Sequence, residues 1–577
     1  MKTQKLLFSI FIAFILLLVA GDVEAQDGAR LSGNLELNGN FFIRDSSINA
    51  ANTPQYDRQL YGADSWLNLN YNYKGFDVGV RFDMFQNSYL LNPAGSYTAQ
   101  GIGNWYVKKS IDKLDITGGY FYDIIGSGII FRAYESRPLA IDQALYGIRL
   151  TYDLTENWRL KGFTGRQKQQ FDLYQSNFRG FSVEGFVSID SSKITLAPGF
   201  GAVGRTLDDN SMNSLVATLN GYEKKDIQDM FQDTVVGGGF KGPRYSTYAF
   251  SLYNTLSYGP FTWYVEGAYK TKDVMFSPLL EREVVLGEQV DTIVGRYIYK
   301  TGTVFYTSLS YAKSGLGITI EGKHTKNFDF RARPQATGIQ GLMHFLPPMT
   351  RVNTYRMLAR YAHNIQFIGE GAIQADIRYR FNKRLTMNLN FSNIGNLEGT
   401  ELYREGYLEF YYKYKRKWNL TAGAQYQEYN QDILQGKPGV PFVTSLTPYF
   451  DFLYKMENKK SIRIEGQYMR LEEEKGVLGD YGNWAFGLVE YSIAPHWTFT
   501  VSDMYNVKPG KLAPPEGAPA EVKEKKHYPR FDIYYTHNTN RYSLSYVKQV
   551  EGIVCSGGIC RLEPAFSGVK VSVNSTF

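Results

Sequence analysis

The sequence ends in Ser567-Gly568-Val569-Lys570-Val571-Ser572-Val573-Asn574-Ser575-Thr576-Phe577, in which apolar and polar residues alternate. Successive side chains of a β-strand point to opposite faces, so every second residue shares a face. The apolar face holds Val569, Val571, Val573 and Phe577, and the polar face holds Lys570, Ser572, Asn574 and Thr576. Such a strand separates an apolar environment from water. An edge strand of a soluble sandwich alternates in the same way, so other regions must decide between the two.

The last residue narrows the choice. Phe577 ends the chain on an aromatic ring with no polar tail after it. In this respect the strand resembles the closing strand of a bacterial outer-membrane β-barrel, whose terminal aromatic residue is read by the barrel-assembly machinery. The resemblance implies that Phe577 is an assembly signal and that this machinery is a partner during insertion.

The first segment has the pattern of a secretory signal peptide. Lys2 and Lys5 precede an apolar run over 6–20, and Val23-Glu24-Ala25 offers a cleavage point before Gln26. We therefore predict a signal peptide over 1–25 and a mature chain that starts in the periplasm. Residues 26–577 are expected to form one domain, because no linker separates regions of different composition before the Pro-rich stretch near residue 515.

Composition favours a membrane barrel. Mean hydropathy is −0.32, and no segment after the signal approaches the roughly 18 apolar residues of a spanning helix. The 45 Tyr, 37 Phe and 7 Trp give an aromatic content of 15%, which girdles at two membrane interfaces would explain. The net charge of +7 is spread along the chain without a basic stripe, so we expect no nucleic-acid partner.

One unit recurs along the chain: two alternating strands of about ten residues joined by a tight turn. The first clear example runs from Ser65 to Met84 around Lys74-Gly75. The tight turns are 74–75, 112–113, 155–157, 190–193, 259–260, 314–315, 382–383, 416–417, 457–460, 494–496 and 538–540. They predict an antiparallel barrel of about 24 strands, within a range of about 20–26. A strand already starts at Leu31, so we expect no N-terminal plug domain, which argues against a TonB-dependent receptor.

The other connections are long. They are 44–62, 87–101, 124–143, 205–243, 273–302, 329–369, 430–443, 507–527 and 550–566. Short turns at one end and long loops at the other are typical of a barrel in the outer membrane of a Gram-negative bacterium, with periplasmic turns and extracellular loops. Outer-membrane lipids would surround it. A soluble propeller would show internal sequence repeats, and we find none.

Charged residues alternate with apolar ones in several strands. Examples are Arg149 among Ile148 and Leu150, and Arg463 and Glu465 beside Ile464. A charge facing lipid at mid-membrane would cost about 2–4 kcal/mol, so these side chains are expected to face the lumen. There they could either pair across strands to fill the barrel or select solutes.

The segment 124–143 is the candidate constriction. Gly126-Ser127-Gly128 permits a sharp inward turn, after which Arg132, Glu135, Arg137 and Asp142 could form a charged aperture. The alternative is a hairpin that extends above the membrane.

The last external loop contains both cysteines of the chain. Cys555-Ser556-Gly557-Gly558-Ile559-Cys560 predicts a small turn closed by a disulfide, in keeping with an exported protein. The six histidines lack any motif that pairs them with a reactive serine or with metal ligands. We therefore expect neither an enzyme nor a bound cofactor or metal.

Two patches resemble a known family. They are Tyr120-Phe121-Tyr122-Asp123 running into Gly126-Ser127-Gly128 and Phe131-Arg132-Ala133-Tyr134-Glu135, and the stretch from Cys555 through Arg561 and Pro564 to the closing strand. Both look like an uncharacterised family of Bacteroidota outer-membrane barrels. The resemblance implies fold and location, and it implies no activity.

Two functions follow from these expectations. The first is a channel or transport protein for polar solutes, because a wide polar lumen without a plug domain suits conduction. The second is a non-conducting scaffold or subunit of a surface assembly, in which the loops 205–243 and 329–369 would be docking surfaces for other surface or outer-membrane proteins.

Overall fold

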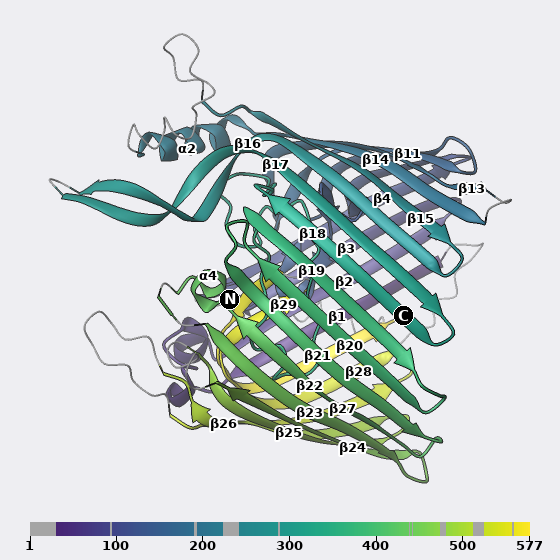
Figure 1. Cartoon of the computed structure of the whole chain (residues 1–577), viewed down its shortest axis with the longest axis vertical. Coiled ribbons are helices and arrows are strands. Elements are labelled where there is room, and N and C mark those ends of the chain that lie inside the picture. The colour runs from purple at the N-terminus through teal and green to yellow at the C-terminus, as the bar shows by residue number, and fades with distance from the viewer. Residues whose placement is uncertain are drawn as a thin grey trace, which may run out of the picture.

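The computed structural model describes residues 30–577 except 93–94, 190–192, 223–241, 287–288, 438, 441, 473–479, 512–523 and 557–558. The predicted signal peptide lies outside these residues. None of the helices in the described part of the chain has the length and hydrophobicity needed to span a bilayer. The main element is a single large antiparallel β-sheet (Figure 1).

The sheet closes on itself. It contains 25 strands, of which β12 and β13 are two parts of one position, since both pair with β14. The ring therefore has 24 positions, as the turn pattern predicts. Its first strand pairs with its last from Asn34↔Thr576 to Phe42↔Gly568, which leaves no open edge.

The bounds of the ring strands follow chain order. They are β1 (Arg30–Phe42), β2 (Tyr61–Tyr73), β3 (Phe76–Ser88), β4 (Tyr97–Ile111), β5 (Leu114–Phe121), β10 (Leu145–Asp153), β11 (Trp158–Gln169), β12 (Asp172–Gly185), β13 (Val187–Ile189), β14 (Ile194–Thr206), β15 (Ser246–Tyr258), β16 (Phe261–Leu286), β17 (Gln289–Lys313), β18 (Leu316–Lys326), β19 (Gly369–Arg380), β20 (Leu385–Gly395), β21 (Glu401–Tyr414), β22 (Trp418–Tyr429), β23 (Val443–Lys455), β24 (Lys460–Leu471), β25 (Gly482–Ile493), β26 (Trp497–Pro509), β27 (His527–His537), β28 (Asn540–Gln549) and β31 (Phe566–Thr576).

Shorter elements lie in the connections. They are η1 (Ser46–Ile48), η2 (Gln55–Gln59), β6 (Asp123–Ile125), β7 (Phe131–Ala133), β8 (Glu135–Ser136), η3 (Arg137–Leu139), β9 (Ile141–Asp142), α2 (Asp209–Asn220), α4 (Gln431–Gln435), β29 (Gly552–Ser556) and β30 (Ile559–Glu563).

The strand alternation sorts side chains between lipid and lumen. In β10, Ile148 and Leu150 are 53% and 45% exposed on the outer surface of the ring. Arg149, between them, donates to the carbonyl of Tyr122 at 3.1 Å and to Thr117 Oγ1 at 3.3 Å. The charged side chain thus faces the interior, as the desolvation cost of a charge in lipid requires.

Both ends of the barrel broadly match the predicted connections. The tight turns lie where expected, although 190–193 is described only at Lys193. The predicted connection at 273–302 leaves the ring where expected, but it is a ribbon of paired strands and not an irregular loop, because β16 and β17 continue through it. Its frequent charges suggest a loop, yet they suit a two-stranded ribbon that leaves the ring.

The ribbon projects from the loop end of the barrel (Figure 1). Beyond Lys270 and Thr303, β16 and β17 pair with each other but have no register partners in β15 or β18. Helix α2 packs on the ribbon through a small buried cluster that includes Leu215, Val274 and Tyr299. The ring thus carries an outward extension at the end opposite its short turns.

Candidate lumen gate

The connection between β5 and β10, residues 122–144, folds into the barrel and is called the first inward segment. Positive φ values of +57° at Gly126 and +100° at Gly128 produce the sharp turn between β6 and β7. Ile129, Ile130 and Phe131 are completely buried in the main hydrophobic cluster. An outward hairpin would expose these side chains to water, so their burial accounts for the inward fold.

The tip of this segment is held by β16, five positions along the ring from β10. Ser127 donates to Glu266 of β16 from its backbone N–H at 3.0 Å and from its hydroxyl at 2.6 Å. Glu266 is fully buried and also accepts from Ser251 and Tyr264, each at 2.6 Å. A Cβ at Gly126 would lie 2.8 Å from Glu266 Oε1, so glycine permits this close approach.

The end of the segment joins a buried ionic cluster. Asp142 contacts Arg81 of β3 at 2.6 Å and Lys168 of β11 at 2.5 Å. Arg81 also contacts Asp83 at 2.6 Å and Glu135 at 3.0 Å. Burial opposes ionisation of Asp142, but the charges of Lys168 and Arg81 outweigh burial and hold its pKa below the usual range. Asp142 therefore stays ionised at neutral pH.

Arg137 extends this cluster to the first strand. Its Nη1 lies 2.6 Å from Glu36 of β1, and its Nε lies 2.8 Å from Glu135. The guanidinium also lies over the ring of Trp66, 5.0 Å from the centroid. Glu135, Arg137 and Asp142 thus belong to one network of ion pairs, and their role as a charged aperture stays a prediction.

Arg132 lies apart from the other three predicted residues. Its guanidinium is stacked between the rings of Tyr134 and Phe345, 4.2 Å from each centroid. Burial lowers its pKa. Among the described residues, no carboxylate forms an ion pair with Arg132, so it packs the inward segments together and does not extend the ionic cluster.

The sequence alone did not identify Arg81 and Lys168 as partners of this segment. Both lie on strands in which apolar and polar residues alternate. That pattern predicts that their charges face the lumen, but it does not predict their partners. Their pairing with Asp142 spans 61 and 26 residues, respectively, and depends on which strands become neighbours.

Two cavities meet at the ionic cluster. The first has a volume of about 430 Å³ and reaches the loop end at Leu90 and Phe171. The second has a volume of about 340 Å³ and reaches the turn end at Asp77 and Lys108. Arg81 and Glu135 line both, so this ion pair stands between a cavity on the loop side and a cavity on the turn side.

The connection from β18 to β19, residues 327–368, also folds inward and crosses the lumen. It is the second inward segment. Side chains of the wall donate to its backbone carbonyls at many points. The pairs are Gln167 to Leu342, Arg205 to Arg331, Lys270 to Asp329, Lys323 to Pro347, Gln425 to Leu358 and Gln427 to Tyr361. These donors belong to β11, β14, β16, β18 and β22, so the segment is fixed to much of the ring.

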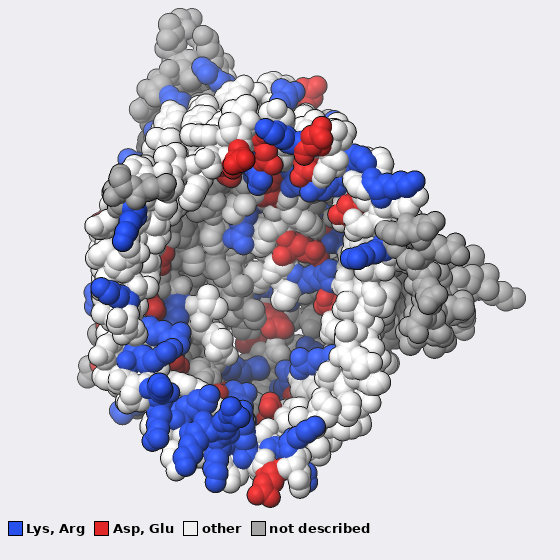
Figure 2. All heavy atoms as spheres, turned by 90° about the vertical axis from the view of Figure 1, so that its right-hand side faces the viewer, with Lys and Arg blue, Asp and Glu red and all other residues white. Residues whose placement is uncertain are grey.

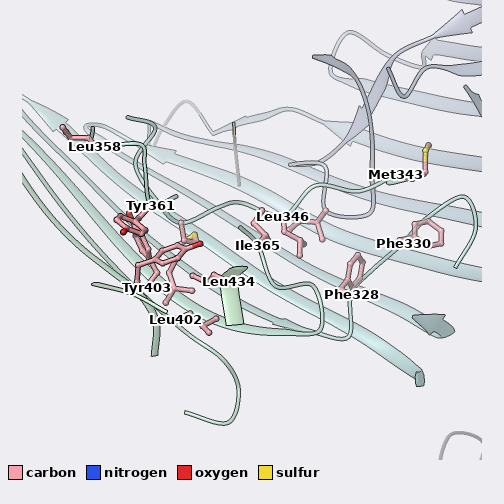
Figure 3. Packing of buried hydrophobic residues seen from close by; sticks show 14 of the residues in the cluster. Phe328, Phe330, Met343, Leu346, Leu358, Tyr361, Ile365, Leu402, Tyr403 and Leu434 are labelled. Atoms are coloured by element: carbon pink, nitrogen blue, oxygen red, sulfur yellow. The ribbon is translucent and has the colours of Figure 1, made fainter. Parts of the chain in front are cut away.

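The second segment also carries a large part of the buried hydrophobic cluster. Phe328, Phe330, Leu346 and Tyr361 are at most 1% exposed, and they lie along the interior between wall strands (Figure 3). The prediction that 329–369 is a docking surface is therefore wrong for Phe330, Leu346 and Tyr361. Aromatic content alone does not distinguish a loop that covers a partner from one that fills its own barrel.

The turn end differs from the loop end. Figure 2 shows that the barrel is hollow when seen from the turn end, with Lys, Arg, Asp and Glu side chains visible inside. Some lumen charges pair across strands, as Arg463 does with Asp451 at 2.9 Å. Pairing of this kind fits the first alternative for lumen charges, in which they pair across strands and fill the barrel.

The remaining predicted residues lie at the rim and in the last loop. Phe577 exchanges two backbone hydrogen bonds with Gly33, at 2.8 and 3.0 Å. Cys555 and Cys560 are register partners in the β29–β30 hairpin, and Cys560 is disulfide-bonded. The side chain of Cys555 lies outside the described residues, so the Cys555–Cys560 disulfide stays a prediction. Cys560 Sγ lies 4.0 Å from the carbonyl oxygen of His363, where the hairpin meets the second segment.

Several solved structures resemble the chain. The translocation pore of the P pilus usher PapC has 9% identity and a TM-score of 0.35, with 95% of this chain and 99% of that chain covered. The outer membrane transporter YddB from Escherichia coli has 8% identity and a TM-score of 0.39, covering 95% and 81%. A BenF-like porin from Pseudomonas fluorescens Pf-5 has 10% identity and a TM-score of 0.32, covering 77% and 94%.

Similarity at this level carries no argument about function. No curated protein matches the chain. The model of a family of unknown function, DUF6029, matches residues 1–577, and the chain therefore belongs to that family.

Proposed function

We propose that the protein is an outer-membrane channel for small polar solutes, with its turn end in the periplasm and its loop end outside the cell. The closed ring, its apolar outer surface and its charged lumen support this proposal. The hollow turn end provides a wide inner mouth. The two inward segments narrow the lumen at the loop end, where selection would occur.

The position of the ionic cluster carries the proposal. Arg81 and Glu135 separate the two cavities, and Glu135 and Arg137 belong to a segment held by side-chain contacts. A solute that moves between the cavities must pass this ion pair. The cluster is thus the proposed gate, and its fixed charges would set which solutes pass.

The test is conductance in planar bilayers for wild type, Arg137→Ala and Arg132→Ala. Arg137→Ala removes the cationic partner of Glu36 and one of the two cationic partners of Glu135, so the gate becomes more negative by one charge. The expected result is a channel whose reversal potential in a salt gradient shifts toward cation preference. Arg132→Ala is the matched control, since it removes an equal charge from a stacked position outside the ionic cluster.

Equal selectivity in all three proteins would reject the ionic cluster as the filter. Absence of conductance from a barrel that is folded, as judged by different mobility of boiled and unboiled samples on SDS gels, would reject the channel.

A scaffold is the second candidate, and the β16–β17 ribbon favours it. The ribbon and α2 extend beyond the ring and could bind another surface protein. Gentle purification from native membranes tests this function. A stoichiometric companion that is lost when 276–296 is replaced by a short turn would support it, and a barrel recovered alone would reject it.

A further inference from the structure

A cavity at the loop end is lined by three arginines of the second inward segment. Arg351, Arg356 and Arg360 border a space of about 340 Å³, together with Tyr403, Tyr481 and other residues. Glu563 is the one carboxylate among the described lining residues. The lining therefore carries an excess of positive charge.

None of the three arginines forms an ion pair with a described residue. Arg360 lies between the rings of Tyr481 and Trp484, 4.3 and 4.6 Å from their centroids. Its Nε and Nη2 atoms are buried and have no hydrogen-bond partner. Arg351 stacks on the ring of Tyr407, 3.6 Å from the centroid.

The arginines also act on one another. Burial, followed by the positive charges of Arg360 and Arg530, lowers the pKa of Arg356 to about 10. Arg356 is still charged at neutral pH. Three partly buried arginines that share one lining carboxylate are costly, because atoms such as Nε and Nη2 of Arg360 have lost water without gaining an acceptor. Stacking on aromatic rings compensates only in part, since a ring face accepts no N–H hydrogen bond in the guanidinium plane.

We propose that this cavity binds an oxyanion of a small organic solute, either a phosphate ester or a carboxylate. Guanidinium groups match both geometrically, because two parallel N–H donors can reach two oxygens. The buried Nε and Nη2 of Arg360 form such a pair of donors. The aromatic and apolar lining, which includes Tyr403, Leu358 and Ile553, accommodates the remainder of the solute.

The site has a structural consequence. The cavity lies between the second inward segment, the start of β25 near Tyr481 and the last loop at 550–553. A bound anion would neutralise the arginines and fasten these three segments together. The inference deepens the proposed function by naming the solute class, but binding can be measured without conduction.

The test is isothermal titration of the purified full chain in detergent at constant ionic strength. The probes are inorganic phosphate and pyrophosphate in one arm, and succinate and citrate in the other, with chloride as the background anion. Wild type should bind at least one arm saturably. Binding by the phosphates alone assigns a phosphate ester, binding by the carboxylates alone assigns a carboxylated solute, and both support the proposal.

Arg360→Gln and Arg356→Gln should each weaken binding at least tenfold. Arg404→Gln is the control, because Arg404 pairs with Glu401 and Glu428 away from the cavity. Heat-dependent gel mobility checks that each variant is folded, and either cavity variant suffices if the other does not fold. No saturable binding of any probe up to ~10 mM, or equal affinity in a folded cavity variant, overturns the proposal. Either result would leave the channel itself open to the conductance test.

Discussion

Glu266→Ala should release the tip of the first inward segment. The carboxylate accepts two hydrogen bonds from Ser127, and each bond to a charged acceptor contributes about 1.5–3 kcal/mol. The variant should therefore weaken docking of the tip by about 3–6 kcal/mol, which raises the population of the undocked state by about 10²–10⁴-fold. The ring itself should persist, because its backbone pairing does not involve this side chain.

Amide hydrogen exchange measured by mass spectrometry gives the result directly. Peptides that cover 124–131 should exchange much faster in Glu266→Ala than in wild type. Glu321→Ala is the matched control, since Glu321 of β18 accepts from the Tyr306 hydroxyl and, within the described part of the chain, forms no hydrogen bond or ion pair with the inward segments. Unchanged exchange of 124–131 in a folded Glu266→Ala barrel, or equal acceleration in both variants, would refute the assignment of Glu266 as the anchor.

Three further predictions concern acidity, the last loop and assembly. Burial lowers the pKa of His344 from 6.5 to about 4, so the folded state disfavours its protonation. The contribution of neutral His344 to the free energy of unfolding is therefore complete above pH 6.5 and falls as pH drops toward 4. The expected loss is about 2 kcal/mol between pH 7 and pH 5. The hydrogen-exchange protection factors of 328–346, which correct for the pH dependence of the intrinsic amide rate, should fall over this interval in wild type, and the same fall in His344→Gln would contradict the assignment. Intact mass of protein taken straight from cells should show a Cys555–Cys560 disulfide, whereas two free thiols would exclude it. The same spectrum should show a mature chain beginning at Gln26, and boiled and unboiled samples should differ in mobility on SDS gels, as a closed barrel requires; identical mobility together with purification as a water-soluble protein would contradict insertion.

The ring could be predicted from local patterns because its determinants are local. Alternation in stretches such as 65–84 and tight turns such as Lys74-Gly75 specify strands and their partners without distant information. The ribbon form of 273–302 was not predicted, since exposed charges at positions such as Glu281 resemble those of a loop. A ribbon outside the membrane can expose such charges on both faces.

The gate was only partly predictable. The glycines and apolar residues of 124–131 indicate an inward turn, because an outward one would expose Ile129 and Ile130. The role of Arg132 could not be assigned from sequence, since the sequence does not distinguish an arginine that stacks on aromatic rings from one that forms an ion pair. Tertiary neighbours decide between them: Phe345 comes from a segment more than 200 residues away.

The most direct test of the proposed gate is removal of the first inward segment. Phe121 and Leu145 are register partners at the ends of β5 and β10, so a short glycine-containing turn can replace 123–143 without separating the strands. The measurement is uptake of sucrose by proteoliposomes that contain equal amounts of wild type or shortened barrel, each checked for heat-dependent mobility. We predict faster uptake through the shortened barrel, because the ion pair between Arg81 and Glu135 would be lost and the two cavities would join. Uptake equal to that of wild type through a folded, shortened barrel would contradict the account.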